Sequence, residues 1–443
     1  MRDQPGHIHH PGHAVVIGAG IVGVAVVHAL LDDGWGVTLL DPGAPGGTQA
    51  ASHGNGAFIS PASIVPMSMP GVWRNVPGWL LDPLGPLTIR WRALPRLVPW
   101  LWRFLAAGRT EARVRRTAGI LSGLLQDGPE RHLKLAAAHG LDGMIRREGL
   151  VYAYPDRAAF EADALAWRLR RENGLEWQEV EGEALRALEP ALGPGHRFAA
   201  VVAAGAHCSD PAGYVAALAD AAILRGARHV RAAATGFRID AGRLSAVETG
   251  AGVGAIECDR AVICAGIHSA GLARAAGDAV PLVSERGYHV QLPDAHGGPA
   301  RPVLPSDGKM ANTPLAGGLR ASGQVELATT EAAPDWRRAD ILVDNLRRTY
   351  PGLRFDAAKA IRWMGHRPST PDGLPVIGRA RASGQVLHAF GHGHVGLAGA
   401  PKTAAIVAAL AGGRAPPIPA DPFSAARFRR ATTRREEDAM PPA

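Results

Sequence analysis

Three glycines near the start of the chain, Gly18, Gly20 and Gly23, follow a short apolar run and have the spacing of a phosphate-binding turn. Gly18 permits a tight turn, Gly20 lets backbone amides approach a pyrophosphate, and Gly23 lets a helix pack closely against a strand. Ile21 and Val22 open that helix, whose N-terminus favours an anion. The pattern therefore predicts binding of a dinucleotide.

The elements that must hold this turn are a strand at 14–17, a helix at 21–31 and a second strand at 37–41. Asp41 ends the second strand, where its carboxylate can accept a hydroxyl group of ribose. Residues 14–31 are also apolar enough for a membrane span or a signal sequence. Three features argue against a membrane span or a signal sequence. The run contains three glycines at motif spacing, it stops at two aspartates, and it lacks a cationic leader with a cleavage site.

A loop of small residues follows Asp41 and includes Ser52, Gly54, Asn55 and Gly56. A segment this poor in bulky side chains contributes little to a core. Ser52 could donate to a phosphate, and the next residues could present amides to a planar ring. An ordinary surface loop has the same composition, so the residues alone leave both interpretations open.

The totals describe a globular protein of 443 residues with 47% hydrophobic residues and a net charge of +8. Nearly all cations are arginines, and no basic stripe with interleaved aromatic residues appears outside 73–105, so we expect no nucleic-acid partner. The 3 cysteines have no metal-binding or disulfide spacing, which predicts a reducing cytoplasm. We expect no metal site, because the histidines of the late loop lack a neighbouring carboxylate or thiolate.

Tryptophan, arginine, proline and leucine are concentrated in residues 61–116. Aromatic rings and arginines beside apolar side chains are typical of a helix at a membrane interface. The same residues would fit a lid or a substrate-domain insertion whose tryptophans lie in the core. Residues 280–360, by contrast, predict an antiparallel sheet that carries a pocket.

Five motifs lie in a recognisable order: Ser52 to Gly56, a strand ending in Ala265 and Gly266, Glu-Arg-Gly-Tyr-His at 285–289, Arg-Pro-Ser-Thr-Pro-Asp-Gly-Leu-Pro at 367–375, and Gly-His-Gly-His-Val-Gly at 391–396. Together with the first turn they resemble the FAD-dependent D-amino-acid dehydrogenase family, which is similar to glycine oxidase and D-amino-acid oxidase. The resemblance covers nearly the whole chain. It implies an α/β fold with a Rossmann-like FAD-binding domain of the glutathione-reductase type and an inserted antiparallel-sheet substrate domain.

The resemblance implies FAD as the cofactor and a set of residues that contact it. Those residues are Gly18, Gly20, Ile21, Val22, Gly23, Asp41, Ser52, Gly54, Asn55, Gly56, Ala234, Ala265, Gly266, Gly393, His394, Val395, Gly396 and Leu397. The late loop would close the site against the flavin N1 and C2 carbonyl. Amides at a helix N-terminus stabilise the negative charge that reduced flavin carries there.

Three catalytic residues are implied by the same resemblance. Arg367 would hold the substrate carboxylate through the two parallel hydrogen bonds of its guanidinium. Tyr288 would line the pocket and bind the carboxylate or amine, and His289 would accept the ammonium proton. The implied reaction is oxidative deamination of a D-amino acid, including substrates like D-proline, with hydride passing from Cα to flavin N5 and electrons then passing to a quinone or another non-oxygen acceptor.

Two alternatives remain at this stage: an oxidase of glycine or sarcosine that uses oxygen, and a flavoprotein that modifies tRNA. The expected domains are an FAD-binding domain at 14–60, 197–280 and 361–425, a substrate-binding domain at 61–196 and 281–360, and flexible tails at 1–13 and 426–443. We expect a cytoplasmic protein that contacts the inner face of the cell membrane through 73–105. The oligomeric state does not follow from the sequence.

Overall fold

The computed structural model describes residues 11–82, 85, 87–250 and 252–429. Most of the two predicted tails, residues 1–10 and 430–443, lies outside the described residues. Regular structure extends slightly into both predicted tails. His13 is the first residue of strand β1 (His13–Ile17), and Ala425–Phe428 form a 3-10 turn.

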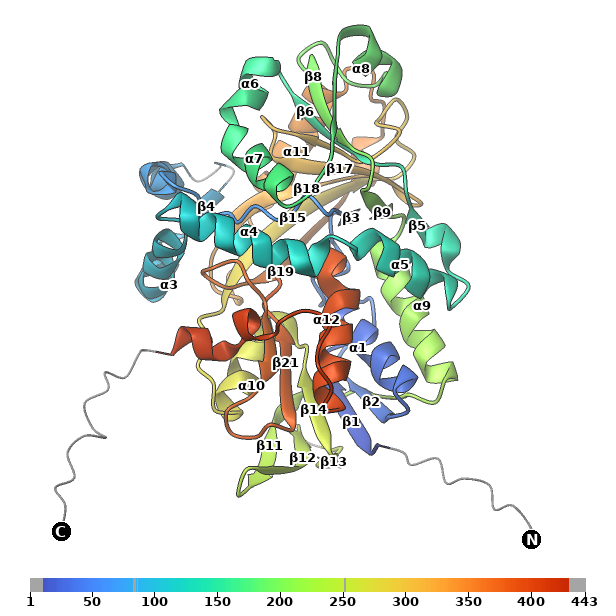
Figure 1. Ribbon diagram of the computed structural model, residues 1–443. Coiled ribbons are helices and arrows are strands. Elements are labelled where there is room, and N and C mark those ends of the chain that lie inside the picture. Colours follow the sequence, from blue (N-terminus) through green and yellow to red (C-terminus); the bar gives the residue numbers. More distant parts are fainter. Residues whose placement is uncertain (1–10, 83–84, 86, 251, 430–443) are drawn as a thin grey trace, which may run out of the picture.

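A six-stranded sheet holds the glycine turn and forms the lower part of Figure 1. In spatial order its strands are β10 (Arg228–Val230), β2 (Gly36–Leu40), β1, β14 (Arg260–Ile263), β21 (Val386–Phe390) and β20 (Val376–Arg379). Neighbouring strands are parallel except for β20, which is antiparallel to β21. The apolar β1 lies between β2 and β14, as expected for a parallel strand that is covered on both faces.

Helices cover one face of this sheet. There α1 (Ile21–Asp32) packs against α12 (Gly396–Ala411) and α9 (Pro211–Leu224), and α12 also contacts α4 (Glu111–Leu125) and α5 (Gly128–Ala137). Asp210 caps α9, as predicted, by accepting a hydrogen bond of 3.0 Å from the backbone of Gly213.

The opposite face packs against α10 (Ser269–Ala275) and a small antiparallel sheet. The strands of that small sheet are β11 (Ala234–Asp240), β12 (Arg243–Thr249) and β13 (Ile256–Glu257). With helices on one side and this sheet on the other, both faces are buried, which matches the predicted Rossmann-like domain.

A nine-stranded mixed sheet forms the upper part of the molecule (Figure 1). In order it contains β19 (Ile361–Ser369), β15 (Val283–Leu292), β18 (Gly318–Leu327), β17 (Met310–Leu315), β16 (Val303–Pro305), β6 (Leu150–Tyr154), β8 (Phe198–Val202) and β7 (Gln178–Glu181), and β4 (Leu87–Ile89) pairs with β18. Strands β15, β17, β18 and β19 are antiparallel to their neighbours within that group, as the sequence predicted.

Two predicted domain boundaries need correction. Strand β8 was expected to open the second part of the nucleotide domain, and β19 its third part, but both pair within the nine-stranded sheet. The residues that return to the nucleotide sheet begin later, at β20 in the third part. The sequence could not locate these domain boundaries, because a short apolar strand can pair in either the six-stranded or the nine-stranded sheet and only the tertiary structure determines which.

Smaller elements surround the large sheet. Helix α11 (Arg337–Thr349) packs on β15 and β18, while β3 (Phe58–Ile59), β9 (Ala206–Cys208) and β5 (Ile145–Arg146) form a short sheet of their own. The remaining helices of the upper part are α6 (Arg157–Ala162), α7 (Ala164–Glu172) and α8 (Gly182–Leu188).

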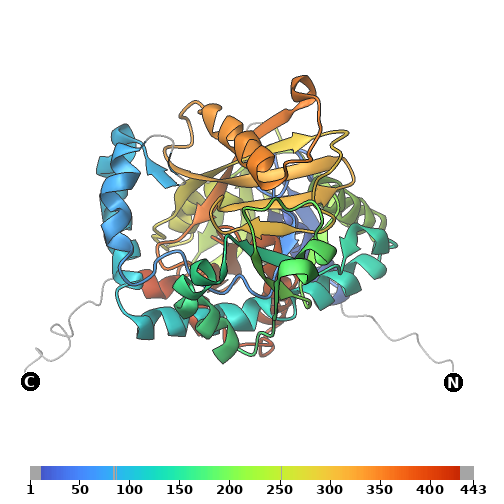
Figure 2. The same cartoon turned by 90° about the horizontal axis from the view of Figure 1, so that it is seen from above.

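The tryptophan-rich segment folds as α2 (Val76–Leu81), β4 and α3 (Leu94–Ala107) along one edge of the molecule, where Figures 1 and 2 both place α3. Trp100 is buried and stacks on Phe104, whereas Trp91 and Trp102 are 61% and 75% exposed. The segment thus has both a core face and an outer apolar face. Among the described residues, no helix is both long enough and apolar enough to cross a membrane.

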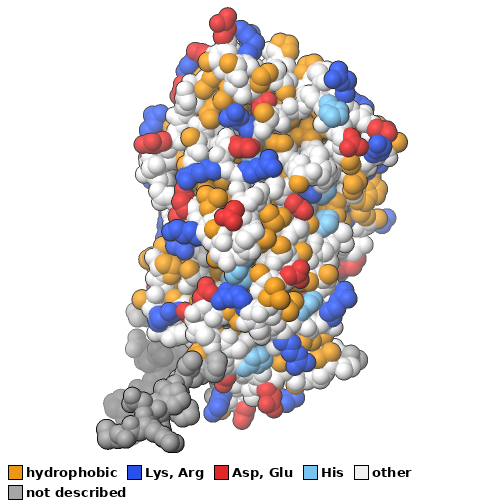
Figure 3. Space-filling model, turned by 90° about the vertical axis from the view of Figure 1, so that its right-hand side faces the viewer, with side chains coloured by type: hydrophobic (Ala, Val, Ile, Leu, Met, Phe, Trp, Pro, Cys, Tyr) orange, Lys and Arg blue, Asp and Glu red, His pale blue; other side chains and the backbone are white. Residues whose placement is uncertain are grey.

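The surface carries its charges in a mixed pattern. On the face drawn in Figure 3, arginine and lysine side chains alternate with acidic ones, and no continuous basic stripe appears on that face. Many of the described arginines form ion pairs with neighbouring carboxylates, for example Arg115 with Glu172 at 2.7 Å. The excess positive charge is therefore spread out on this face.

Buried histidines predict an acid-sensitive fold. Burial lowers the pKa of His132, His207 and His392 to about 4. Since the unfolded chain binds these protons near pH 6.5, the free energy of unfolding should fall as pH is lowered from about 6.5 to about 4, by up to about 1.4 kcal/mol per pH unit for each histidine. Urea denaturation at pH 7, 6, 5 and 4 measures this, and equal stability at pH 7 and pH 5 would contradict it.

Candidate functional site

The first glycine turn joins β1 to α1 and is built as the spacing predicted. Gly18 has φ of +112°, and a Cβ there would lie 2.4 Å from the carbonyl oxygen of Cys264. A Cβ on Gly23 would lie 1.8 Å from the carbonyl oxygen of Gly18. Only glycine fits at either position, so the turn brings the N-terminus of α1 against the ends of β1 and β14.

Asp41 and Ser52 hold the same turn. The Asp41 carboxylate accepts hydrogen bonds from the backbone of Ala19 at 2.8 Å and of Gly43 at 2.7 Å. Ser52 Oγ accepts a hydrogen bond of 3.0 Å from the backbone of Ile21 in the first turn of α1, and its own proton stays available to a ligand. Both side chains therefore order the backbone as well as facing the space beside it.

A cavity of about 520 Å³ lies beside this turn and is lined by residues from both ends of the chain. The predicted cofactor residues that line it are Gly18, Gly20, Ile21, Val22, Asp41, Ser52, Asn55, Ala234, Ala265, Gly266, Gly393, Gly396 and Leu397. The N-termini of two helices, α1 and α12, open on this one space. An elongated anionic ligand such as a dinucleotide fits these donors.

Five predicted cofactor residues do not line this cavity. Gly23 packs α1 against the sheet, and Gly54 lies under the indole of Trp363, which a Cβ on Gly54 would approach to 2.0 Å. Gly56 is likewise outside the lining, and His394 and Val395 face a second, smaller cavity. The sequence pattern missed His366 and His268 as lining residues, because neither lies in a glycine motif.

The late loop places the start of α12 at this cavity. The helix begins at Gly396, so Pro401 lies inside it. Proline lacks the N–H that would bond the carbonyl of Leu397 four residues earlier. That carbonyl accepts a hydrogen bond of 2.7 Å from the buried His132 of α5 instead, which fastens the α12 N-terminus to a neighbouring helix.

Arg367 lies on β19 directly opposite Glu285 on β15. Its guanidinium lies over Gly287, and a Cβ on Gly287 would lie 2.4 Å from Arg367 Cζ. The Nη1 of Arg367 lies 3.3 Å from the carbonyl oxygen of Gln324 and 3.5 Å from Glu285 Oε1. Gln324 has φ of +60°, in the left-handed region. The Arg367 side chain is 22% exposed, and within the described residues Nε and Nη2 have no protein partner, so they stay available to a ligand.

Tyr288 does not line either cavity, which corrects the expectation. Successive residues of a strand point to opposite faces, and Tyr288 points with Arg286 to the face covered by α11. Its hydroxyl donates to Glu326 at 2.7 Å and accepts from the backbone of Asp335 at 3.0 Å. Tyr288 therefore belongs to a buried polar cluster behind the sheet.

His289 points to the opposite face from Tyr288 but is also committed to the protein. Its ring stacks on Trp363 with centroids 5.1 Å apart, and Nδ1 lies 3.2 Å from the carbonyl oxygen of Gly54. Burial, and to a smaller extent the neighbouring charge of Arg320, lower the pKa of His289 to about 3. The neutral imidazole holds the Gly54 loop in place and is a poor acceptor for an ammonium proton.

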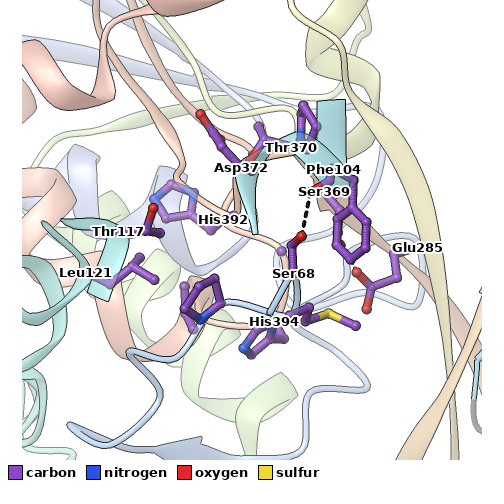
Figure 4. A pocket seen from close by; sticks show the side chains of 18 of the residues that line it. Ser68, Phe104, Thr117, Leu121, Glu285, Ser369, Thr370, Asp372, His392 and His394 are labelled. Atoms are coloured by element: carbon purple, nitrogen blue, oxygen red, sulfur yellow. Dashed lines mark hydrogen bonds between the residues drawn. The ribbon is translucent and has the colours of Figure 1, made fainter. Parts of the chain in front are cut away.

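A second cavity of about 40 Å³ lies on the other side of the late loop and shares Gly391, His392 and Gly393 with the large one. Figure 4 shows Glu285, His394 and Phe104 around it. Glu285 and the aromatic wall of Trp100 and Phe104 were not predicted as site residues. Among the described residues, no group of three or more histidine, cysteine or acidic side chains could hold a metal ion.

The sequence resembles curated proteins of one kind over nearly its full length. It is 49% identical over 418 residues to a D-amino-acid oxidase of Bradyrhizobium diazoefficiens, with 94% of this chain and 99% of that protein covered. It is 32% identical to D-amino acid dehydrogenase 2 of Ralstonia nicotianae, covering 93% of this chain and 99% of the other.

Solved structures share the fold at low sequence identity. Glycine oxidase from Geobacillus kaustophilus superposes with a TM-score of 0.69 at 20% identity, covering 94% of this chain and 99% of the other. L-proline dehydrogenase from P. horikoshii superposes with a TM-score of 0.71 at 19% identity, covering 94% and 97%. The profile of the family described as FAD dependent oxidoreductase (DAO) matches residues 13–410. The chain therefore belongs to the DAO family of FAD-dependent oxidoreductases.

Proposed function

We propose that this enzyme oxidises the Cα–N bond of a D-amino acid to an imino acid, which water converts to a 2-oxo acid and ammonia. The observation that carries the proposal is Arg367, which lines neither cavity itself but has an available guanidinium edge. Its Nη1 lies 3.5 Å from Glu285 Oε1, and Glu285 lines the smaller cavity that adjoins the dinucleotide cavity. The names of the relatives, oxidase and dehydrogenase of D-amino acids, support the same reaction and the same stereochemistry.

FAD would be held by the residues that line the large cavity. The Asp41 carboxylate would accept ribose hydroxyls, and the α1 N-terminus with Ser52 would bind the pyrophosphate. The amides of Gly393, Gly396 and Leu397, at the start of α12 and just before it, would face the pyrimidine edge of the flavin. When bound, FAD supplies the acceptor for the two electrons and the hydride that leave the substrate.

Arg367 would bind the substrate carboxylate through two parallel hydrogen bonds and so fix the direction of the Cα–H bond. The adjoining cavity has room for about three water molecules, since one water needs roughly 10–15 Å³ of such space. Trp100 and Phe104 close it with apolar surface. We therefore propose substrates with a small or cyclic side chain, D-alanine and D-proline or hydroxy-D-proline among them.

The electron acceptor in this proposal is a quinone or another non-oxygen acceptor, as the several relatives named D-amino acid dehydrogenase suggest. A second candidate is an oxidase that passes electrons to oxygen, and the 49% identical relative named D-amino-acid oxidase favours it. Peroxide formed in stoichiometric amounts in air would select the oxidase. Reduction of a soluble quinone analogue without peroxide would select the dehydrogenase.

An anaerobic assay tests the proposed reaction. Purified holoenzyme should show flavin absorbance, and D-alanine or D-proline should bleach it, while the L-enantiomers and sarcosine should not. Ammonia and pyruvate released from D-alanine confirm deamination. If no D-amino acid reduces the bound flavin, the proposed function is wrong, and bleaching by glycine or sarcosine alone would indicate the amine oxidase.

We also propose that the outer face of α2 and α3 rests on an anionic membrane surface. Trp91, Trp102 and Leu81 are 61%, 75% and 74% exposed there. Exposed arginines flank them on α3 and the turn before it, at Arg92, Arg96 and Arg103. Exposed tryptophans with neighbouring cations suit the headgroup region of a lipid bilayer. Such contact would place the enzyme beside a membrane quinone.

Replacing Trp91 and Trp102 with serine should weaken binding to phosphatidylglycerol vesicles by about tenfold for each tryptophan, because each ring loses at least about 1.5 kcal/mol of burial. Sedimentation with vesicles measures the change. Leu224→Ser is the control, because Leu224 is 89% exposed at the end of α9, outside this segment. Equal vesicle binding by wild type and double variant would contradict the proposal.

A further inference from the structure

Glu285 is an acidic side chain in a place that the proposed reaction leaves unexplained. It lies on β15 opposite Arg367, is 5% exposed, and lines the smaller cavity with His394 and the aromatic residues of α3. Figure 4 shows it beside this cavity, near His394 and Phe104. A buried carboxylate is costly unless charge and hydrogen bonds compensate it, so its partners indicate its use.

The partners of Glu285 leave part of its carboxylate available. Oε2 accepts a hydrogen bond of 2.9 Å from Ser369 Oγ, and Oε1 lies 3.5 Å from Arg367 Nη1, beyond the distance of a good charge-assisted hydrogen bond. A carboxylate can accept about four hydrogen bonds, and two are accounted for here at most. The remaining capacity lies at the wall of the cavity.

Arg367 and Glu285 together present one positive and one negative group side by side. An α-amino acid carries its carboxylate and its ammonium on the same carbon, so the two groups of the substrate are opposite in sign to Arg367 and Glu285, whose Nη1 and Oε1 lie 3.5 Å apart. A carboxylate held by Arg367 would bring the ammonium within reach of the neighbouring Glu285. A ligand that has a carboxylate but no ammonium group would offer no positive charge to Glu285.

Resting on the proposed function, we propose that Glu285 binds the substrate α-ammonium and accepts its proton. The N–H bond breaks and an O–H bond forms on Glu285, which leaves the amine neutral with its lone pair. With FAD bound as the two-electron acceptor, that lone pair would form the C=N bond as the Cα–H hydrogen leaves with its electron pair, giving an iminium. The proton on Glu285 returns to solvent before the next turnover.

Other titratable groups face Glu285 around this cavity, and most are already paired. Asp372 is bound to Arg427 at 2.8 Å, and His392 Nε2 lies 2.9 Å from Thr403 Oγ1. Burial lowers the pKa of His394, which leaves its ring neutral. His394 is therefore the rival acceptor, and the test must separate it from Glu285.

The test uses holoenzyme of wild type, Glu285→Gln and His394→Gln, with D-alanine as substrate under anaerobic conditions. For Glu285→Gln we expect kcat/KM at pH 7 to fall about 100-fold. Its kcat/KM should also keep rising with pH toward the pKa of the substrate amine, because only the neutral amine can then react. His394→Gln should keep the wild-type pH profile. A Glu285→Gln profile parallel to that of wild type, or a loss confined to His394→Gln, would overturn the proposal.

A binding measurement distinguishes recognition from a folding defect. Propionate, which is D-alanine without its amine, should bind Glu285→Gln at least as tightly as wild type, since the competing carboxylate beside Arg367 is gone. Perturbation of the bound-flavin spectrum reports this affinity. Weaker propionate binding in Glu285→Gln would indicate a damaged pocket. In that case Glu285→Asp, which keeps the carboxylate, tests the proposal. If kcat/KM of Glu285→Asp is not at least tenfold higher than that of Glu285→Gln, the proposal is wrong.

The exposed Glu183→Gln on α8 is the control that should match wild type throughout. Failure of wild type itself to be reduced by any D-amino acid would count against the proposed function and not against the role of Glu285 within it.

Discussion

Gly23→Ala should abolish stable binding of FAD. The new methyl group would lie 1.8 Å from the carbonyl oxygen of Gly18 and 3.3 Å from Cys264 Cβ, and backbone atoms cannot yield as a flexible side chain can. Helix α1 must therefore move away from β1 and β14, which carries its N-terminal amides out of the dinucleotide cavity. Overpacking of this kind costs about 1–3 kcal/mol of folding stability.

The measurement is the ratio of flavin to protein after gel filtration, with an equilibrium titration of FAD to the apoprotein. We expect a loss of FAD affinity of about 100-fold, which corresponds to roughly 3 kcal/mol. Gly271→Ala is the matched control, because Gly271 is also helical but a Cβ there meets nothing within 4 Å. That control should keep FAD and gain up to about 1 kcal/mol of stability. Full flavin content in Gly23→Ala would refute the assigned turn.

Arg367→Ala should lower kcat/KM for D-alanine by about 1000-fold. Two charge-assisted hydrogen bonds to the carboxylate contribute about 2 kcal/mol each, and every 1.4 kcal/mol is a factor of ten. The variant should still bind FAD, because Arg367 does not line the dinucleotide cavity. The kcat/KM of Arg367→Lys should lie between those of wild type and Arg367→Ala, because lysine keeps the positive charge but lacks the planar guanidinium with its two parallel donors.

Stopped-flow reduction of the flavin measures this effect without involving the electron acceptor. The control is Arg362→Ala on the same strand, where the guanidinium is 47% exposed and pairs with Asp340 at 2.7 Å. Its kcat/KM should stay within twofold of wild type. A fall of less than tenfold in Arg367→Ala would remove the carboxylate role from this arginine.

Sequence spacing was sufficient for the first glycine turn and for the family. Gly18, Gly20 and Gly23 act through contacts with the adjacent turn and strands, so their spacing along the chain already describes their geometry. The helix cap at Asp210 was predictable for the same reason, since the side chain bonds a backbone group three residues later.

Strand faces were decided only by tertiary pairing. Tyr288 and His289 are neighbours on β15, so they cannot both point into one pocket. The pairing of β15 with β19 and the packing of α11 determine that Tyr288 turns to Glu326, while Glu285, Gly287 and Arg367 share the face near the smaller cavity. The motif at 285–289 correctly identified β15 as a strand of the site, but the residue of this motif that lines the smaller cavity is Glu285 and not Tyr288 or His289.

What the sequence by itself determined is the local apparatus: the turn at Gly18 to Gly23, the acidic end of β2 at Asp41 and the family to which these belong, because each depends on residues close together in the chain. Only the tertiary structure decided that β8 and β19 join the large sheet, that His132 replaces the missing N–H of Pro401, and that Glu285 lies beside Arg367. Those contacts join segments as far as 265 residues apart, and no local pattern predicts that such segments meet.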